Sequence, residues 1–359
     1  MRTGIDISQV VYGTGVSQYT KYLVEAMLAI DQENEYILFG GALRRIGELQ
    51  KTITLTQNAK LKTYPIPPTL AHILWNKLHV FPIENLTGHL DVFHSSDWTQ
   101  PPSKAYKITT VHDLAPILFP ETSNPDIVDA HRARLEWVKK EVDRVIAVSS
   151  ATKKDLVEHL GFNPEKIVVI PEAGKPGMQK VHNNEVEDIR KKHKIAGPYL
   201  LAIGANPRKN LSNIGRAYAS IKREYPDLKL VVVGSSWVKN PQQEGVIYTG
   251  SVSESELPAL YGGAEALVYT TLYEGFGQPI LEAMQMKCPV VTSNISSMPE
   301  VAGNAAVLVN PTEPEDIEKG IREVFKNPKK WTEKGKERAK QFSWQDTAKL
   351  TLRVYRGEL

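Results

Sequence analysis

The sequence predicts an α/β protein built from two doubly wound, Rossmann-like domains. Its 359 residues exceed the size of one ordinary domain and suit two. Short apolar runs alternate with amphipathic helical stretches along nearly the whole chain, which favours parallel sheets with helices on both faces. The alternation stops once, over residues 171–195, and then restarts. We therefore expect two domains that face each other across a cleft beside the carboxyl ends of their strands.

The expected elements follow from these runs in chain order. In the first half we expect strands at 3–7, 36–39, 92–94, 108–111, 144–148 and 167–170, and helices at 17–28, 69–81, 125–140 and 151–160. A short charged helix at 185–193 ends the break. In the second half we expect strands at 199–203, 230–233, 245–248, 266–269 and 290–292, and helices at 211–223, 254–261, 279–286, 313–325, 329–341 and 344–356.

Composition excludes several classes of protein. The net charge of +3 is too small to indicate a nucleic-acid-binding protein. Cys288 is the only cysteine, so an intrachain disulfide cannot form, and its apolar surroundings favour an inert packing role. The N-terminal segment lacks the apolar core of a signal peptide. The sequence also contains no run of about 18 apolar residues, the length that is needed to span a bilayer. Histidines and cysteines do not cluster at metal-ligand spacing, so we expect no metal site.

The segment Glu274-Gly275-Phe276-Gly277-Gln278-Pro279-Ile280-Leu281-Glu282 carries the sharpest functional signal. Glycines in a turn that runs into a helix N-terminus offer backbone N–H groups to phosphate oxygens. The flanking carboxylates can accept hydrogen bonds from hydroxyl groups. A nucleotide-activated sugar has both kinds of group. A helix start with an acidic first turn would explain Glu282, but it would not explain an aromatic residue between two glycines preceded by an acid.

Three weaker motifs also follow predicted strands. Residues 204–210 place Arg208 and Lys209 before a helix, where cations oppose the helix dipole and suit a diphosphate better than a structural role. Gly15 lies in a glycine turn that opens the first helix, although such a turn is also common in α/β architecture. His112 ends a strand and could meet a sugar, whereas a core-edge histidine is the alternative. His94, at another strand end, is expected to be structural.

The chain resembles retaining glycosyltransferases of the GT-B fold in glycosyltransferase family 4, over essentially its full length. The matching segments are Thr14-Gly15-Val16, Val111-His112-Asp113-Leu114, Ala147-Val148-Ser149, Pro207-Arg208-Lys209-Asn210, 273–282 and 298–303. The resemblance implies an acceptor-side domain at 1–180, a nucleotide-sugar-binding domain at 181–342, and a last helix at 343–359 that packs back on the first domain. Many relatives carry an arginine directly after the strand-ending glycine, where this chain has Ala205 and Asn206, so that role either passes to Arg208 or is absent.

The resemblance also implies the roles of individual residues. Glu274 would contact the donor sugar, Glu282 would hold the ribose, and Arg208 and Lys209 would balance the leaving diphosphate. The implied catalytic positions are His112, Arg208, Lys209 and Glu274. The implied donor-binding positions are Gly15, Gly275, Phe276, Gly277, Glu282 and, near the base, Val252.

The activity expected from this resemblance is transfer of a hexose from a nucleoside diphosphate sugar to a hydroxyl of a saccharide or lipid-linked saccharide, with retention and without a metal or other cofactor. The Pro-Arg-Lys-Asn form favours mannose, and GDP-mannose is the expected donor. The expected location is cytoplasmic, with peripheral contact at the inner face of a membrane as a further possibility. An NDP-sugar epimerase, a phosphorylase, and a nucleotide-sugar-binding protein without chemistry are the alternatives.

The segment 64–81 leaves two interpretations open. Leu70, Ile73, Leu74 and Leu78 recur at helical spacing. They could meet a lipid-linked acceptor or a membrane. The core face of an amphipathic helix is the interpretation we favour from the pattern.

Overall fold

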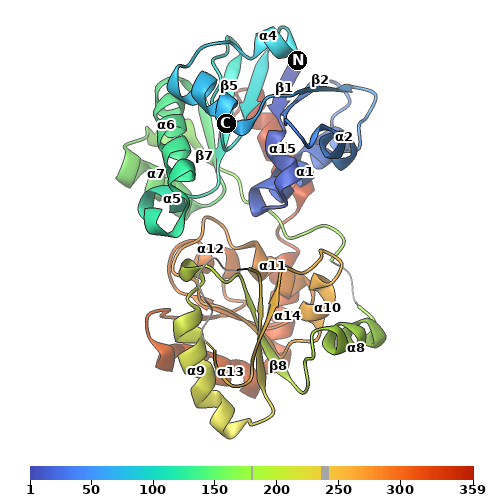
Figure 1. Ribbon diagram of the computed structural model, residues 1–359, viewed down its shortest axis with the longest axis vertical. Coiled ribbons are helices and arrows are strands. Elements are labelled where there is room, and N and C mark those ends of the chain that lie inside the picture. Colours follow the sequence, from blue (N-terminus) through green and yellow to red (C-terminus); the bar gives the residue numbers. More distant parts are fainter. Residues whose placement is uncertain (179–180, 236–241) are drawn as a thin grey trace. The chain divides into compact units, whose positions relative to one another are not determined.

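The computed structural model describes residues 1–178, 181–235 and 242–359. It divides the chain into two compact units, Met1–Glu172 with Ser343–Leu359, and Ala173–Phe342. The first unit therefore ends at Glu172, eight residues before the boundary expected from the sequence. Each unit is an α/β layer structure, and helices flank each sheet in Figure 1. The two are described separately below as unit 1 and unit 2.

Unit 1 contains a seven-stranded sheet in which every neighbouring pair of strands is parallel, with the order β3-β2-β1-β4-β5-β6-β7. The strand order reverses direction between β1 and β4. The strands are β1 Arg2–Asp6, β2 Glu35–Gly41, β3 Ala59–Tyr64, β4 Val92–Ser95, β5 Tyr106–Val111, β6 Arg144–Ala147 and β7 Ile167–Val169. The helices are η1 Ser8–Tyr12, α1 Gly15–Ile30, α2 Ile46–Thr52, α3 Pro68–Ala71, η2 His72–Lys77, α4 Glu84–Thr87, α5 Ala115–Leu118, η3 Pro120–Thr122, α6 Pro125–Glu141, α7 Ser150–Leu160, η4 Pro164–Lys166 and α15 Trp344–Tyr355.

Unit 2 repeats this architecture with six parallel strands in the order β10-β9-β8-β11-β12-β13. Its order reverses between β8 and β11. The strands are β8 Tyr199–Ile203, β9 Lys229–Val233, β10 Val246–Gly250, β11 Ala266–Tyr269, β12 Val290–Ser293 and β13 Val307–Val309. The helices are α8 Asn183–Lys192, η5 Pro207–Lys209, α9 Leu211–Glu224, α10 Leu257–Gly262, α11 Gln278–Gln285, α12 Met298–Ala302, α13 Pro314–Lys326 and α14 Pro328–Ala339.

These two sheets confirm the predicted fold class, and most predicted elements lie within three residues of the observed ones. The apolar runs form the central strands because parallel strands are buried on both faces. In unit 2, for example, Leu200, Val232 and Val268 belong to one buried cluster with the inner faces of α9 and α13. In unit 1, α15 packs beside α1, so the last helix belongs to the same unit as the N-terminus.

The sequence reasoning missed the edge strands β3 and β13 and the short helices α2, α4, α5 and α12. β3 alternates lysines with small or apolar residues and lies half-buried at a sheet edge, so it has no apolar run to detect. β13 has only three residues. Elements this short carry too little periodicity to be recognised.

The predicted helix at 69–81 is wrong in detail. The chain forms one turn of α-helix in α3 and then the π-helix η2, which ends at Lys77. In this conformation Ala71 and Trp75 belong to the buried core cluster of unit 1. Leu70, Ile73 and Leu78 are instead 42%, 46% and 61% exposed, so the favoured interpretation as a core face is wrong for these three residues. Leu74 packs partly buried against the core.

Candidate active site

Two loops of unit 2 leave the sheet at the point where its strand order reverses, after β8 and after β11. Ligands of open α/β sheets bind at the carboxyl ends of strands beside such a reversal. The loop after β8 carries Arg208 and Lys209 in the short helix η5, and the loop after β11 carries Glu274. The topology therefore brings the predicted cations and the predicted carboxylate to the same edge of the sheet.

Lys209 and Glu274 form a direct ion pair at this edge. The Lys209 Nζ atom lies 2.6 Å from Glu274 Oε1 and donates a second hydrogen bond to the Tyr269 hydroxyl at 2.7 Å. The ammonium group also lies 4.7 Å from the centre of the Tyr269 ring. Both charged side chains are about 15% exposed, so the pair is largely shielded from solvent. A ligand at this edge would meet an oriented cation and an oriented anion side by side.

The same surroundings set the protonation state of Glu274. Burial by itself would raise the pKa of this carboxyl group, but the charges of Lys209 and Arg208 outweigh burial and lower it below its ordinary value. Thr271 adds a hydrogen bond from its hydroxyl to Glu274 Oε1 at 3.0 Å. Glu274 is therefore a carboxylate at neutral pH, a form that accepts hydrogen bonds from hydroxyl groups and donates none.

Arg208 holds the two loops together. Its Nη1 atom donates to the Tyr273 carbonyl at 3.0 Å, and its own carbonyl accepts from the Leu272 amide and the Thr271 hydroxyl, both at 2.9 Å. The buried Nε atom has no hydrogen-bond partner among the described residues. A buried donor of this kind is costly unless a ligand or water accepts from it.

Glycines shape the backbone on both sides of the ion pair. Gly204 directly follows β8 and has φ of +87°, and a Cβ atom there would lie 2.7 Å from Cε of Lys209. The missing side chain thus makes room for the lysine stem. Gly277 has φ of +105° and precedes α11, and a Cβ atom there would lie 2.6 Å from Met298. Such values of φ favour glycine strongly.

Two serines brace the glutamate loop from the start of α12. The Ser296 hydroxyl donates to the Glu274 carbonyl at 2.6 Å, and the Ser297 hydroxyl donates to the carbonyls of Glu274 and Phe276, both at 2.9 Å. Sequence reasoning missed both serines, together with Tyr269 and Thr271. The run Tyr269-Thr270-Thr271 at the end of a strand could have indicated the last two of these residues. Polar residues at the carboxyl end of a buried strand lie at the edge of the sheet where ligands bind.

Glu282 lies in α11, five residues after Gly277. It is buried and accepts a hydrogen bond at 2.7 Å from the hydroxyl of Tyr261. Burial raises the pKa of its carboxyl group, while the Tyr261 hydrogen bond and the charge of Lys175 act in the opposite direction. Lys175 itself pairs with Glu254 at 2.9 Å. Val252, predicted near the base, lies half-buried in the loop after β10.

Gly15 and His112 belong to unit 1, whereas the other predicted site residues belong to unit 2. Gly15 is the first residue of α1, after Thr14, whose hydroxyl caps the helix by accepting from the Ser17 amide. A Cβ atom on Gly15 would meet no atom within 4 Å, so packing does not require glycine there.

His112 is held by a buried partner that the sequence did not reveal. Its Nδ1 atom lies 3.0 Å from Oε1 of Glu172, and the ring packs edge-on against Tyr19 at 4.5 Å between centroids. Burial alone would lower the pKa of His112, but the hydrogen bond and charge of Glu172 outweigh it and raise the pKa. His94 behaves differently, because burial lowers its pKa to about 3. It bonds to Tyr355 and Thr110 in the core, in agreement with a structural role.

The raised pKa of His112 predicts a specific pH dependence of stability. A group whose pKa is higher in the folded state stabilises the fold fully below its unfolded pKa of about 6.5, and this contribution is lost as the pH rises through the folded pKa. The stability advantage of the wild type over His112→Gln should therefore shrink as the pH rises above about 6.5. Urea denaturation across the pH range measures this, and an advantage that stays constant or grows would contradict it.

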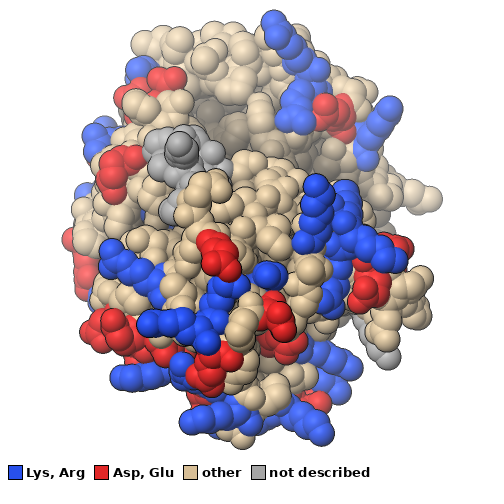
Figure 2. Space-filling model, turned by 60° about the horizontal axis from the view of Figure 1, so that its bottom comes forward, with Lys and Arg blue, Asp and Glu red and all other residues tan. Residues whose placement is uncertain are grey.

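The described parts of the chain contain neither a cluster of metal ligands nor a helix that could span a membrane. No group of three or more His, Cys, Asp or Glu side chains within these parts could hold a metal ion. None of the helices in residues 1–178, 181–235 and 242–359 has the length and apolar content needed to cross a bilayer. On the face shown in Figure 2, lysines and arginines are interspersed with acidic residues instead of forming one basic patch.

Comparison with known proteins identifies the class of protein. The family model "Glycosyltransferase Family 4" matches residues 13–173, and "Glycosyl transferases group 1" matches residues 185–342. The two matches together span most of both units. The chain belongs to glycosyltransferase family 4 and is a glycosyltransferase with the GT-B fold.

Two full-length relatives are mannosyltransferases of O-antigen synthesis. The chain is 28% identical to O-antigen chain mannosyltransferase B of Escherichia coli, over 96% of each chain. It is 27% identical to O-antigen chain mannosyltransferase RfbU of Salmonella typhimurium, over 88% of each chain. Among solved structures, Anabaena Alr3699/HepE in complex with UDP-glucose shares the fold with a TM-score of 0.72 at 16% identity, over 99% of this chain and all of the other.

Proposed function

We propose that this glycosyltransferase moves a hexose, with mannose favoured, from a nucleoside diphosphate sugar to a hydroxyl of a saccharide or lipid-linked saccharide in polysaccharide biosynthesis. The observation that carries the proposal is the Lys209–Glu274 pair at the strand reversal of unit 2. The mannosyltransferase names of the relatives support the choice of sugar, and GDP-mannose is the proposed donor. The choice of the donor base and the retention of configuration at the anomeric carbon are inferred from the resemblance to the family.

The ion pair suits the two chemical parts of such a donor. Diphosphate oxygens can replace Glu274 as the acceptors for the Lys209 ammonium group and can also accept from Arg208. The Glu274 carboxylate is then released to accept hydrogen bonds from sugar hydroxyls. Binding therefore exchanges one set of charge-assisted hydrogen bonds for another, without leaving a buried charge unpaired.

The proposed chemistry is departure of the nucleoside diphosphate and attack by the acceptor hydroxyl on the same face of the sugar. The sugar–oxygen bond breaks as negative charge gathers on the diphosphate, and the acceptor oxygen forms the new bond while its proton passes to the leaving group. Lys209 and Arg208 stabilise the developing charge, and a preoriented cation needs no rearrangement to do so. We propose that this requires no metal ion.

A screen of nucleotide sugars tests the proposal directly. A ligand that binds the folded protein raises its melting temperature according to its concentration and affinity. GDP-mannose is expected to raise the melting temperature more than UDP, ADP and dTDP sugars do.

Incubation with donor alone separates the alternatives, because an epimerase would change the sugar and a transferase would give slow hydrolysis. Absence of a shift with every nucleotide sugar would overturn the proposal.

Gly15 and His112 of unit 1 stay predicted contributors to donor binding. Gly15→Ala is informative because the fold has space for the methyl group and alanine favours a helix. The melting temperature should stay the same or rise slightly, whereas the KM for the donor should rise about tenfold, the cost of losing about 1.4 kcal/mol of binding. Donor titrations of Gly15→Ala and the wild type measure this. An unchanged KM would remove Gly15 from the donor site.

Peripheral membrane contact is a further proposal. The exposed side chains of Leu70, Ile73 and Leu78 on unit 1 support it. Co-sedimentation with anionic liposomes tests it, and no binding at low salt would end it.

A further inference from the structure

A cavity of about 490 Å³ in unit 1 lies at the strand reversal of that unit, between β1 and β4. Its lining includes Ser8 just after β1, Gly41 at the end of β2, and Ser96 just after β4. The reversal between β1 and β4 is the position where an open α/β sheet accommodates a ligand. The volume falls within the range of roughly 300–1,000 Å³ typical of small-molecule sites.

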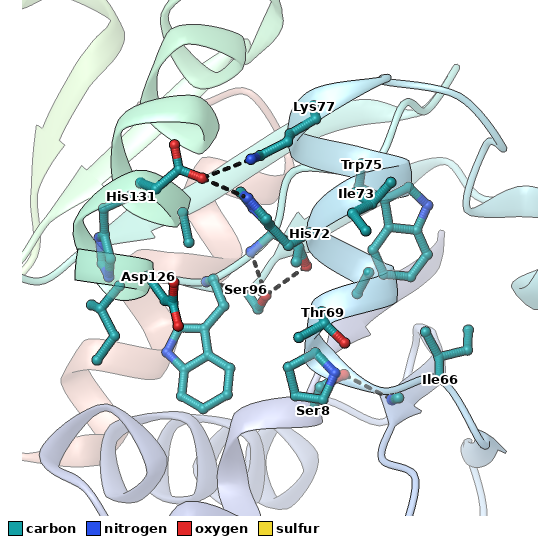
Figure 3. A pocket seen from close by; sticks show the side chains of 18 of the residues that line it. Ser8, Ile66, Thr69, His72, Ile73, Trp75, Lys77, Ser96, Asp126 and His131 are labelled. Carbon is teal, nitrogen blue, oxygen red and sulfur yellow. Dashed lines mark hydrogen bonds and ion pairs between the residues drawn. The ribbon is translucent and has the colours of Figure 1, made fainter. Parts of the chain in front are cut away.

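The walls of this cavity combine aromatic and apolar surface with a few polar groups. Trp98 and Tyr12 lie with ring centroids 4.5 Å apart, and Ile66, Ile73 and Ile127 add apolar surface. Figure 3 shows Asp126 and His131 on one wall, facing Ile66, Thr69 and Ile73 on the other. Apolar and aromatic surface with few convergent polar groups fits a sugar ring, which has an apolar face and a hydroxylated edge.

The polar groups at the cavity are held in place by their neighbours. Asp129 Oδ2 lies 3.1 Å from His72 Nε2 and 2.9 Å from Lys77 Nζ. The amide of buried Asn76 donates to His72 Nδ1 at 3.2 Å and to the Trp98 carbonyl at 2.9 Å. Because Nδ1 accepts this bond, Nε2 of a neutral His72 carries the proton and donates to Asp129. Asn76 thus orients both the histidine and the tryptophan backbone.

The charges at the cavity disfavour a phosphate. Lys77 is the only Lys or Arg among the described lining residues, and Asp129 already pairs with it. Asp126 supplies a second carboxylate to the lining. Burial lowers the pKa of His131, so this lining imidazole is neutral near pH 7 despite the nearby Asp97. The cavity therefore offers hydrogen-bond acceptors for hydroxyl groups and lacks the unpaired cations that a phosphate group requires.

We propose that this cavity binds a neutral, unphosphorylated sugar ring of the acceptor, with Trp98 and Tyr12 against its apolar face and Asp129 and His131 accepting from its hydroxyls. The inference rests on the proposed function, since the ring is an acceptor only if the protein transfers sugars. This proposal narrows the acceptor to a glycan whose sugar at this subsite carries no phosphate. The reaction would then extend an existing saccharide.

A bulky substitution at the rim of the cavity tests the proposal. Ile73 lines the cavity and is 46% exposed, so Ile73→Trp should add bulk to the cavity at little cost to folding. Leu78→Trp is the matched control, because Leu78 is more exposed, lies in the same segment and does not line the cavity. The probes are methyl α-mannopyranoside, methyl α-glucopyranoside and N-acetylglucosamine, with mannose 6-phosphate as the charged counterpart.

Ligand-observed NMR should detect binding of at least one neutral probe to the wild type and to Leu78→Trp, with binding to Ile73→Trp weakened at least about tenfold, a loss of about 1.4 kcal/mol. Mannose 6-phosphate should neither bind nor compete. Donor hydrolysis by the wild type and by the control Leu78→Trp should be equal, and its absence from the wild type would count against the proposed function instead. Equal probe binding by Ile73→Trp, no binding of any neutral probe by the wild type, or preferred binding of the phosphate would overturn the inference.

Discussion

Replacing Lys209 with alanine should lower kcat by about two orders of magnitude or more at saturating donor. The expected size follows from the loss of one preoriented donor to a developing negative charge. The Lys209 ammonium group is fixed by the Glu274 carboxylate and the Tyr269 hydroxyl, so it needs no reorganisation to meet a diphosphate. Steady-state kinetics of Lys209→Ala with the donor identified by the melting screen measure the effect.

Two controls separate this effect from a loss of folding. Removing Lys209 leaves the buried Glu274 without its nearest cation, so some destabilisation is expected, and the assay must run well below the melting temperature of the variant. Lys330→Ala removes an exposed lysine of the same unit and should leave kcat unchanged. Full activity of Lys209→Ala at saturating donor would exclude the proposed role.

Replacing Arg134 with methionine should lower the free energy of unfolding by about 3–5 kcal/mol, the usual cost of breaking a buried ion pair. Arg134 is fully buried in α6, where Nη1 lies 3.3 Å from Asp97 and Nη2 donates to Thr109 and to the Thr110 carbonyl. Methionine has a similar length but leaves the Asp97 carboxylate buried without its cation. Urea denaturation, with m-values compared between variants, gives the measurement.

Arg132→Met is the matched control, because Arg132 is an exposed arginine of the same helix. Its effect should stay within about 0.5 kcal/mol, as for most surface substitutions. Equal stability of the two variants would show that the buried pair contributes nothing to the fold.

The sequence predicted the central strands of both sheets because strands buried on two faces appear as continuous apolar runs. It could not give the strand order, which depends on contacts between segments far apart in the chain. The reversals at β1/β4 and β8/β11, which position the candidate site and the unit 1 cavity, are visible only in the sheets themselves. The π-helix η2 likewise leaves no periodic trace, so the exposure of Ile73 and Leu78 could not be foreseen.

The candidate site likewise has a part that the sequence predicts and a part that only the structure shows. Lys209 and Glu274 follow strands in sequence, so their loops could be identified without a structure. Their direct pairing spans 65 residues, and the partnership of His112 with Glu172 spans 60. Such partners are not encoded in local spacing. Tyr269, Ser296 and Ser297 stabilise the site through hydrogen bonds to it, and no sequence motif distinguishes them from ordinary polar residues.

A crystal structure with the nucleotide sugar that gives the largest melting shift tests the central claim most directly. The account predicts that the diphosphate lies within hydrogen-bond distance of Lys209 Nζ and that the sugar hydroxyls donate to Glu274, whose bond to Lys209 is replaced. A nucleotide bound away from the strand reversal of unit 2, with the Lys209–Glu274 pair intact, would contradict it.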